Sequence, residues 1–225
     1  MESITAQRLM DIFATGFSSL SLLVFTPSGI IVFANNVAIK AFKGETMQSV
    51  KGKRLVDLAP PAWANERVKY MQLAAKSGNP IPIIELLAGT RLYSLLRPVE
   101  VMHKGEIETL IFITVEPISP IQLRWLREHD TGDELIMAEH IDLGRLSVLT
   151  SREIEVLALM GQGLRQKEIA TKLCRSISTI DRHRERIGEK LDIKDRADLI
   201  AIAREAGLEV EDAKRTHMSM KPKLP

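Results

Sequence analysis

The chain has 225 residues, 45% of them hydrophobic and 27% charged, so it is long enough for two modest domains with their own cores. Its formal net charge of +2 does not indicate nucleic-acid binding by itself, so any DNA binding must come from local geometry and from two copies acting together. The sequence has no run of about 18 apolar residues and no secretory signal pattern, and Cys174 is its only cysteine; we therefore expect a cytoplasmic protein with no membrane contact and no internal disulfide.

The first half of the chain combines short helical and strand-like segments. A helix is expected over residues 1–17, and two β-rich runs follow, Leu20–Phe25 and Ile30–Ala34, joined by a Pro-Ser-Gly turn. Short helical pieces then extend from Asn35 to Ser77, with the longest over Asn65–Lys76. Three more strand-like runs come next: Ile81–Ala88, Arg91–Met102 and Ile107–Pro117. This order predicts an α+β domain with a five-stranded antiparallel sheet and helices on one face.

Residues 18–118 resemble a PAS domain, a sensor module of about this size. The resemblance rests on the order of the elements, the hairpin that ends in Asn35-Asn36, the segment VKGKRLVDL and the long final hairpin. It implies a ligand pocket between the sheet and the helices. The polar side chains that we expect at this pocket are Asn35, Trp63, Tyr70, Arg91 and Tyr93, and ordinary packing is the alternative for each.

The cofactor stays unknown from these residues. Flavin sensors of the PAS class that form a cysteinyl bond need a cysteine here, and residues 1–148 contain none. Haem sensors commonly ligate iron from a histidine on the long helix, and Asn65–Lys76 has no histidine. Both groups are therefore disfavoured. The signal is a small molecule or a protein, or the domain only dimerises, with the helix at 1–17 pairing against its copy.

Residues 119–148 form an acidic linker that carries three basic and six acidic side chains. A helix is expected over Ile121–His129 and a second helical piece over Glu134–His140; the pattern leaves open whether the linker is rigid. The last segment, 209–225, is polar, rich in lysine and proline, and without periodicity after Val210. We therefore expect a flexible tail there.

The segment Leu149–Leu191 contains three short amphipathic helical patterns. Thr150 and Glu153 match a capping box at the start of the first helix, the second spans Gln166–Leu173, and Ser176 is a good N-cap for the third. At about 100° per residue, one face of the third helix carries Ile180, Ile187 and Leu191, and the opposite side carries Ser178, Arg182, Glu185, Arg186 and Glu189. This arrangement is typical of a helix-turn-helix whose last helix enters the major groove of DNA.

Residues 149–208 resemble the four-helix DNA-binding domain of LuxR-type transcription regulators. The matching segments are LTSREIEVL, GQGLRQKEIA, STIDRH and Lys190-Leu191, with a last helix from about Asp195. The resemblance implies that the second and third helices bind double-stranded DNA, with phosphate or backbone contacts from Lys167, Ser178, Thr179 and Lys190. It also implies that the fourth helix forms a homodimer, for which the sequence offers Leu199, Ile200, Ile202 and Ala203.

The sequence departs from that family at several positions. Arg165 stands where a Ser or Thr cap is usual, and Cys174 stands where a glycine commonly makes the turn between helices. Asp181 and Glu185 stand where lysines often contact bases; carboxylates accept from cytosine amino groups but repel phosphates. Arg182 and Arg186 offset this and can each pair with guanine. We therefore expect target-selective DNA binding with weak nonspecific affinity.

Together these patterns predict a homodimeric transcription regulator that is not an enzyme. Two alternatives remain. One is a helical bundle with a solvated ion-pair face made of Arg182, Glu185, Arg186 and Glu189. The other is an adaptor whose helix-turn-helix contacts another protein, favoured by Asp181 and Glu185. No catalytic set, zinc cysteine pair or phosphate-binding glycine loop appears in the sequence. We also expect Cys174 to be buried as a small hydrophobic residue and His183 to be a packing residue at the helix edge.

Overall fold

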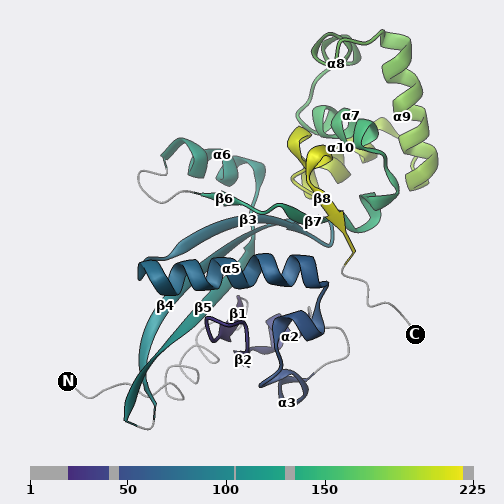
Figure 1. The fold of residues 1–225 in the computed structure, drawn as a ribbon. Helices are drawn as coiled ribbons and strands as arrows, with labels where there is room; N and C mark the ends of the chain where they lie inside the picture. Colours follow the sequence, from purple (N-terminus) through teal and green to yellow (C-terminus); the bar gives the residue numbers. More distant parts are fainter. Residues whose placement is uncertain (1–19, 41–45, 104, 130–134, 220–225) are drawn as a thin grey trace.

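Five antiparallel strands form the centre of the N-terminal domain (Figure 1). The computed structural model describes residues 20–40, 46–103, 105–129 and 135–219; the helix expected over residues 1–17 lies outside them. The order in the sheet is β2-β1-β5-β4-β3, which confirms the predicted α+β domain. The strands are β1 (Ser21–Phe25), β2 (Ile31–Ala34), β3 (Ile81–Leu87), β4 (Thr90–His103) and β5 (Glu106–Pro117).

Helices cover one face of this sheet. The long helix α5 (Pro61–Ser77) lies across the strands, and it begins earlier than predicted because Pro61 occupies the first helical turn, where a proline fits. Three short helices precede it: α2 (Asn36–Ile39), α3 (Met47–Val50) and α4 (Leu55–Leu58). Because side chains alternate along a strand, Ile83 of β3 packs in the core under α5, whereas Ile84 and Leu86 belong to separate hydrophobic clusters.

The linker adds a sixth strand to the sheet. Helix α6 (Pro120–His129) is present as predicted, but the second helical piece at Glu134–His140 was wrong. Its described part instead holds β6 (Ile136–Met137), which pairs parallel with β3, and the start of β7 (His140–Asp142). The edge of β3 offers unpaired backbone groups, and an extended linker satisfies them: the Ala138 N–H donates to the Ile84 carbonyl at 2.9 Å.

The C-terminal domain is all helical at its core, as predicted. A short 3₁₀ helix, η1 (Gly144–Val148), leads into α7 (Ser151–Gly161), α8 (Gln166–Lys172), α9 (Ile177–Leu191) and α10 (Arg196–Glu205). The buried side chains of α7 occupy the centre of its core, and Ile169, Ile180, Ile187 and Leu199 pack around them. Figure 1 places α8 and the start of α9 at the end of this domain that is farthest from the sheet.

The segment after α10 is ordered, so the predicted flexible tail was wrong over residues 209–219. It forms η2 (Val210–Lys214) and β8 (Thr216–Met218), and β8 pairs parallel with β7 of the linker. Residues 220–225 lie outside the described residues. No helical periodicity predicts this order, because it depends on the buried charge of Asp212, on the packing of Leu208 and Ala213 in the core of the C-terminal domain, and on the pairing of β8 with β7.

A buried ion pair joins the two domains. Arg91, at the start of β4, is 1% exposed, and its guanidinium bonds to the carboxylate of Asp212 in η2. The same guanidinium donates to the Gly207 carbonyl through Nε at 3.2 Å and Nη2 at 3.0 Å. Asp212 also accepts from the Glu209 N–H at 2.8 Å and lies 3.3 Å from Nη1 of Arg215. Among the described residues, the side-chain partners of the Arg91 guanidinium therefore all belong to the last segment of the C-terminal domain.

Two glycines allow the domains to approach this closely. Gly207 has φ +57°, and a Cβ on it would lie 2.9 Å from Cβ of Arg91. Gly144 has φ +54°, and a Cβ there would lie 2.7 Å from the backbone carbonyl of Ala88 in the β3–β4 turn. Both positions therefore need glycine for conformation and for space.

Removal of the Asp212 carboxylate should strongly destabilise the protein. Asp212→Ala leaves the Arg91 guanidinium buried without its counter-charge, and loss of one partner of a buried pair costs about 3–5 kcal/mol. A urea titration followed by circular dichroism measures this loss. The control is Asp57→Ala, which breaks the exposed Arg54–Asp57 pair and should leave the midpoint almost unchanged. Equal shifts for the two variants would contradict the role given to the buried pair.

Candidate nucleic-acid interface and sensory cavity

The turn between α8 and α9 has the geometry of a helix-turn-helix. Cys174 adopts φ +53°, the left-handed conformation that a glycine would adopt most easily. Backbone N–H groups of Cys174 and Arg175 donate to Thr171 and Ala170 of α8, which fixes the direction of the chain into α9. Cys174 is exposed, so the expectation that it is buried was wrong. The turn requires the left-handed backbone conformation at Cys174, and it places the thiol of this residue outside the core.

Both predicted helix caps are confirmed. The Ser176 hydroxyl accepts from the Thr179 N–H at 3.1 Å at the start of α9. Thr150 and Glu153 form the capping box of α7, in which the Thr150 N–H donates to Glu153 Oε2 at 2.8 Å. Arg165 gives α8 no side-chain cap, and the Glu168 carboxylate accepts from the Arg165 N–H at 2.6 Å.

Lys190 forms an ion pair with a side chain of its own domain. Its Nζ donates to Glu153 Oε2 at 2.6 Å, which joins the end of α9 to the start of α7. Burial alone would raise the pKa of Glu153, but the hydrogen bonds from Lys190 and Thr150 lower it below its ordinary value. The DNA-backbone contact that the family resemblance implies for Lys190 therefore stays a prediction, and in this structure the ammonium group braces the helices.

The outer face of α9 carries two unpaired arginines. Arg182 and Arg186 are exposed and make no ion pair or hydrogen bond with any described residue, and Ile180 and Ile187 on the opposite side are buried. The ion pairs within α9 instead use Arg184, which lies 3.9 Å from both Asp181 and Glu185. The alternative of an ion-pair face built from Arg182 and Arg186 is therefore not the arrangement found. Lys167 and Ser178 are exposed nearby and Thr179 is partly exposed.

Asp181 has a partner within the helix-turn-helix. Its Oδ1 accepts a hydrogen bond from the side-chain amide of Gln166 at the start of α8. Glu185, one turn further along α9, keeps a side chain that is 63% exposed. The two acids are therefore not equivalent: Asp181 sets the position of α9 against α8, and Glu185 faces solvent. Sequence reasoning missed Gln166 because a contact across a turn leaves no periodic signal.

His183 lies at the edge of α9, where it is partly buried as predicted. Burial, followed by the nearby charge of Arg152, lowers its pKa below the ordinary value, so the neutral imidazole is favoured. Arg152 reaches from α7 to the carbonyl of Leu173 at 2.9 Å. The side chains of His183 and Arg152 therefore pack on the inner side of α9, between this helix and α7.

The predicted dimerisation residues divide into two groups. Leu199 and Ala203 are each 1% exposed and lie in the domain's own core against α7, so their side chains offer no surface to a second copy. Ile200 and Ile202 pack at the edge of that core and stay partly exposed. Dimerisation through α10 stays a prediction, and of the four predicted residues only Ile200 and Ile202 have side-chain surface available for it.

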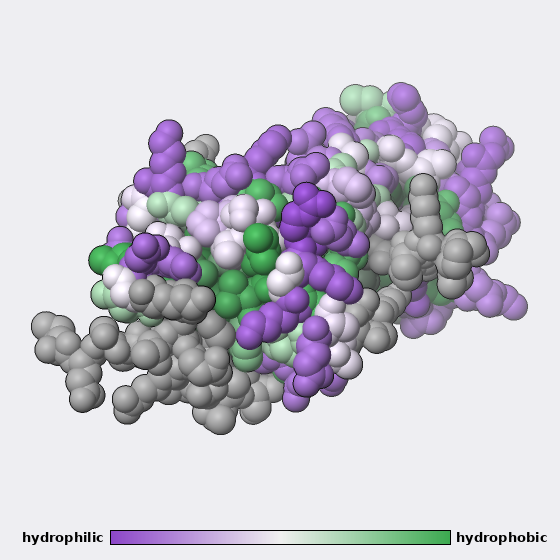
Figure 2. Space-filling model, turned by 60° about the horizontal axis from the view of Figure 1, so that its bottom comes forward, coloured by the Kyte–Doolittle hydropathy of each residue, from purple (hydrophilic) through white to green (hydrophobic). Residues whose placement is uncertain are grey.

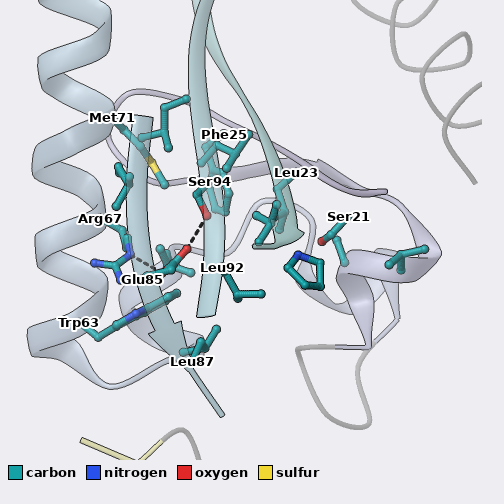
Figure 3. A pocket seen from close by; sticks show the side chains of 18 residues that line it. Ser21, Leu23, Phe25, Trp63, Arg67, Met71, Glu85, Leu87, Leu92 and Ser94 are labelled. Atoms are coloured by element: carbon teal, nitrogen blue, oxygen red, sulfur yellow. Dashed lines mark hydrogen bonds and ion pairs between the residues drawn. The ribbon is translucent and has the colours of Figure 1, made fainter. Parts of the chain in front are cut away.

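A cavity of about 400 Å³ lies between α5 and the sheet of the N-terminal domain (Figure 3). Most of the side chains that line it are apolar, among them Leu23, Phe25, Met71, Leu96 and Ile113. Figure 2 shows hydrophobic side chains gathered near the middle of one face of the molecule, with hydrophilic ones over most of the rest of that view. The position of the cavity agrees with the pocket that the PAS resemblance implies.

One polar cluster interrupts the apolar lining. Glu85 of β3 accepts from the Ser94 hydroxyl and from Arg67 of α5 through Nε at 3.0 Å and Nη2 at 2.6 Å (Figure 3). The Arg67 guanidinium also stacks 4.9 Å from the Trp63 ring. Burial alone would lower the pKa of Arg67, but Glu85 and Glu66 raise it, so this cation stays charged and compensated.

Of the five predicted pocket residues, only Trp63 lines this cavity. Asn35 is a structural residue, since it caps α2 and bonds to the backbone of β1. Tyr70 donates to Glu66, Arg91 joins the domains, and Tyr93 lines a shallower hollow beside α6. The sequence missed Arg67, Glu85 and Ser94, whose meeting depends on strand register rather than on spacing along the chain.

Glu66 ties α5 to the linker. Its carboxylate accepts from the Tyr70 hydroxyl at 2.6 Å, the Glu139 N–H at 2.7 Å and the His140 N–H at 3.1 Å, and it lies 2.9 Å from His140 Nδ1. Burial would raise its pKa, but these hydrogen bonds and Arg67 lower it to about 2. The carboxylate thus holds the helix that carries Trp63 and Arg67 against the segment that leads to the C-terminal domain.

The sequence of the C-terminal domain matches a known family. Residues 147–203 match the family described as bacterial regulatory proteins, luxR family. Oxygen regulatory protein NreC of Staphylococcus haemolyticus is 28% identical over 109 residues, which are 48% of this chain and 46% of that protein. NreC of Staphylococcus carnosus is 39% identical over 56 residues, which are 25% of this chain and 26% of that protein. The chain therefore spans less than half the length of these curated relatives.

Two solved structures align with parts of this chain. A Vibrio cholerae VqmA–ligand–DNA complex aligns over 91% of this chain and 90% of its own, with 16% identity and a TM-score of 0.49. The PAS domain of Bordetella pertussis BvgS aligns over 55% of this chain and 96% of its own, with 19% identity and a TM-score of 0.42. Among the described residues, no helix is long and apolar enough to cross a membrane.

The Glu66 contacts predict a specific loss of stability in acid. Because the folded pKa of about 2 lies below the unfolded value near 4.5, the stabilisation is complete above pH 4.5 and is lost as the pH falls toward 2. Glu66→Gln should remove this part of the pH dependence, measured by thermal unfolding between pH 2 and pH 6. Tyr70→Phe deletes one donor and should move the loss to higher pH. A wild-type pH profile in Glu66→Gln would show that another carboxylate is responsible.

Proposed function

We propose that this chain is a DNA-binding transcription regulator whose PAS-like domain controls its helix-turn-helix, because residues 147–203 match the family described as bacterial regulatory proteins, luxR family. The protein acts in the cytoplasm, as a homodimer on double-stranded DNA, and catalyses no reaction. The geometry of α9 carries this proposal: two unpaired arginines project from a helix whose other side is fixed in the core.

The charges around α9 support selective rather than general DNA binding. Arg182 and Arg186 are one turn apart, so both can reach base edges in one major groove, where a bidentate pair with guanine contributes about 1–3 kcal/mol of discrimination. Glu185 lies between them and faces solvent, where it repels phosphates and favours a cytosine amino group. Asp181 is occupied by Gln166, which leaves the exposed Glu185 and Glu189 as the acidic groups on the outer side of α9.

The contacts between the domains support control by the N-terminal domain. The β3–β4 hairpin carries Glu85 on the face that lines the cavity and Leu86 on the face that packs with the C-terminal core. Its turn bonds to the linker, since the Gly89 N–H donates to the Asp142 carbonyl at 2.9 Å. A change in the cavity therefore has a short physical route to the DNA-binding domain. A coupling of about 1–3 kcal/mol is enough for regulation.

Replacement of the two arginines should abolish selective DNA binding. A duplex that the full chain selects from a random pool serves as the probe, and fluorescence anisotropy measures its affinity. Arg182→Ala/Arg186→Ala should weaken binding to this duplex by about 30-fold or more, because two base contacts are lost. Circular dichroism should be unchanged, since both side chains are exposed.

The matched control is Arg97→Ala/Arg124→Ala, which removes the same charge from exposed positions of the N-terminal domain and the linker and should keep the affinity. Equal losses in both double variants would mean that net charge, not α9, determines binding. If the wild-type chain selects no duplex, the result contradicts DNA binding and favours the adaptor whose helix-turn-helix contacts another protein. The two arginine variants should then be tested for binding to a protein partner.

A further inference from the structure

We propose that the cavity under α5 binds an uncharged, largely apolar molecule of metabolite size, and that the indole N–H of Trp63 donates to a hydrogen-bond acceptor on it. This inference rests on the proposed function, in which the occupant of the cavity is the regulatory signal. It goes further by fixing the charge, size and polar group of that signal from the residues that meet it.

The first observation is an unsatisfied donor. Trp63 lines the cavity and is 9% exposed, and its Nε1 is buried without a hydrogen-bond partner among the described residues. Buried polar groups in folded proteins almost always have a partner, because an unpaired one loses its bonds to water. A ligand acceptor, such as a carbonyl or ring nitrogen, would complete this donor; because Nε1 itself is buried, ligand binding must turn the indole ring toward the cavity.

The second observation is the charge balance beside the donor. The Arg67 guanidinium already bonds to Glu85, and its Nη1 lies 3.0 Å from Glu66 Oε2, so two carboxylates compensate one cation. An anionic ligand would meet no free positive charge here and would be repelled by the surplus carboxylate. A cationic ligand would lose its water to a mostly aliphatic wall while both Glu85 oxygens are already accepting. The cavity therefore favours a neutral ligand.

The third observation is size and lining. A volume of about 400 Å³ lies near the lower end of the range of about 300–1,000 Å³ that is usual for small-molecule sites. Side chains from β1, β3, β4 and α5 make an apolar wall, which suits an aromatic or branched aliphatic body. A peptide segment would bring more backbone polar groups than Ser21, Trp63 and Ser94 could satisfy.

Three probes of nearly equal shape test each part of the inference. Acetophenone is neutral and carries a carbonyl acceptor, α-methylstyrene replaces that oxygen by a methylene group, and benzoate is an anion. Isothermal titration calorimetry on the full chain, without DNA, should give affinity for acetophenone about threefold to tenfold above that for α-methylstyrene, the usual worth of one neutral hydrogen bond. Benzoate should not bind.

A single variant ties the preference to the proposed donor. Trp63→Phe keeps an aromatic ring beneath Arg67 but has no N–H, so acetophenone and α-methylstyrene should bind it equally. Trp125→Phe, which alters the exposed tryptophan on α6, is the control and should keep the wild-type preference. If Trp63→Phe does not fold, the comparison of the two probes on the wild-type chain still decides.

Three results would overturn the inference: no binding of any probe up to 1 mM, equal affinity of the wild-type chain for acetophenone and α-methylstyrene, or benzoate binding as tightly as acetophenone. These results do not depend on DNA. If the chain binds acetophenone but selects no duplex, the ligand inference stands and the proposed DNA-binding function is wrong. If it selects a duplex but binds no probe, the proposed function stands and the ligand inference is wrong.

Discussion

The buried pair between Arg91 and Asp212 is the constraint on which the arrangement of the two domains depends. A guanidinium that is almost fully enclosed needs a carboxylate and further acceptors, and here they come from a segment about 120 residues away in the chain. Satisfying it requires the chain after α10 to return to the sensor sheet, which in turn places β8 beside β7. Gly144 and Gly207 are required because the two backbones must come within contact distance around that charge.

The local signals in the sequence predicted most of the secondary structure. Caps such as Thr150 and Ser176, and the apolar spacing of Ile180 and Ile187, depend on residues within one or two turns, so a sequence displays them directly. The linker and the last segment were mistaken for a different reason. Residues 136–137 are extended because they pair with the edge of β3, and Asp212 has a fixed position because it binds the guanidinium of Arg91. Both partners lie far away in the sequence.

The same distinction explains the candidate sites. The face of α9 could be predicted because one helix sets the positions of Arg182 and Arg186. The cavity could not, because Glu85, Ser94 and Arg67 meet only through the register of β3 with β4 and the placement of α5. Among the predicted pocket residues, Asn35 and Arg91 are polar and buried, as pocket residues often are, yet their buried bonds serve a helix cap and a domain contact.

Because the chain after α10 returns to the N-terminal sheet, the C-terminal domain ends at different residues by sequence similarity and by packing. The family match ends at residue 203, whereas the packed unit continues to β8 at Met218. In evolutionary terms, the unit of helices α7–α10 cannot be exchanged at the limits that sequence similarity draws. A recombined chain that kept this N-terminal domain but took another helix-turn-helix ending at α10 would leave Arg91 without the Asp212 carboxylate and the Gly207 carbonyl. Inheritance of Arg91 should therefore be linked to inheritance of residues 207–218, although the family pattern includes neither.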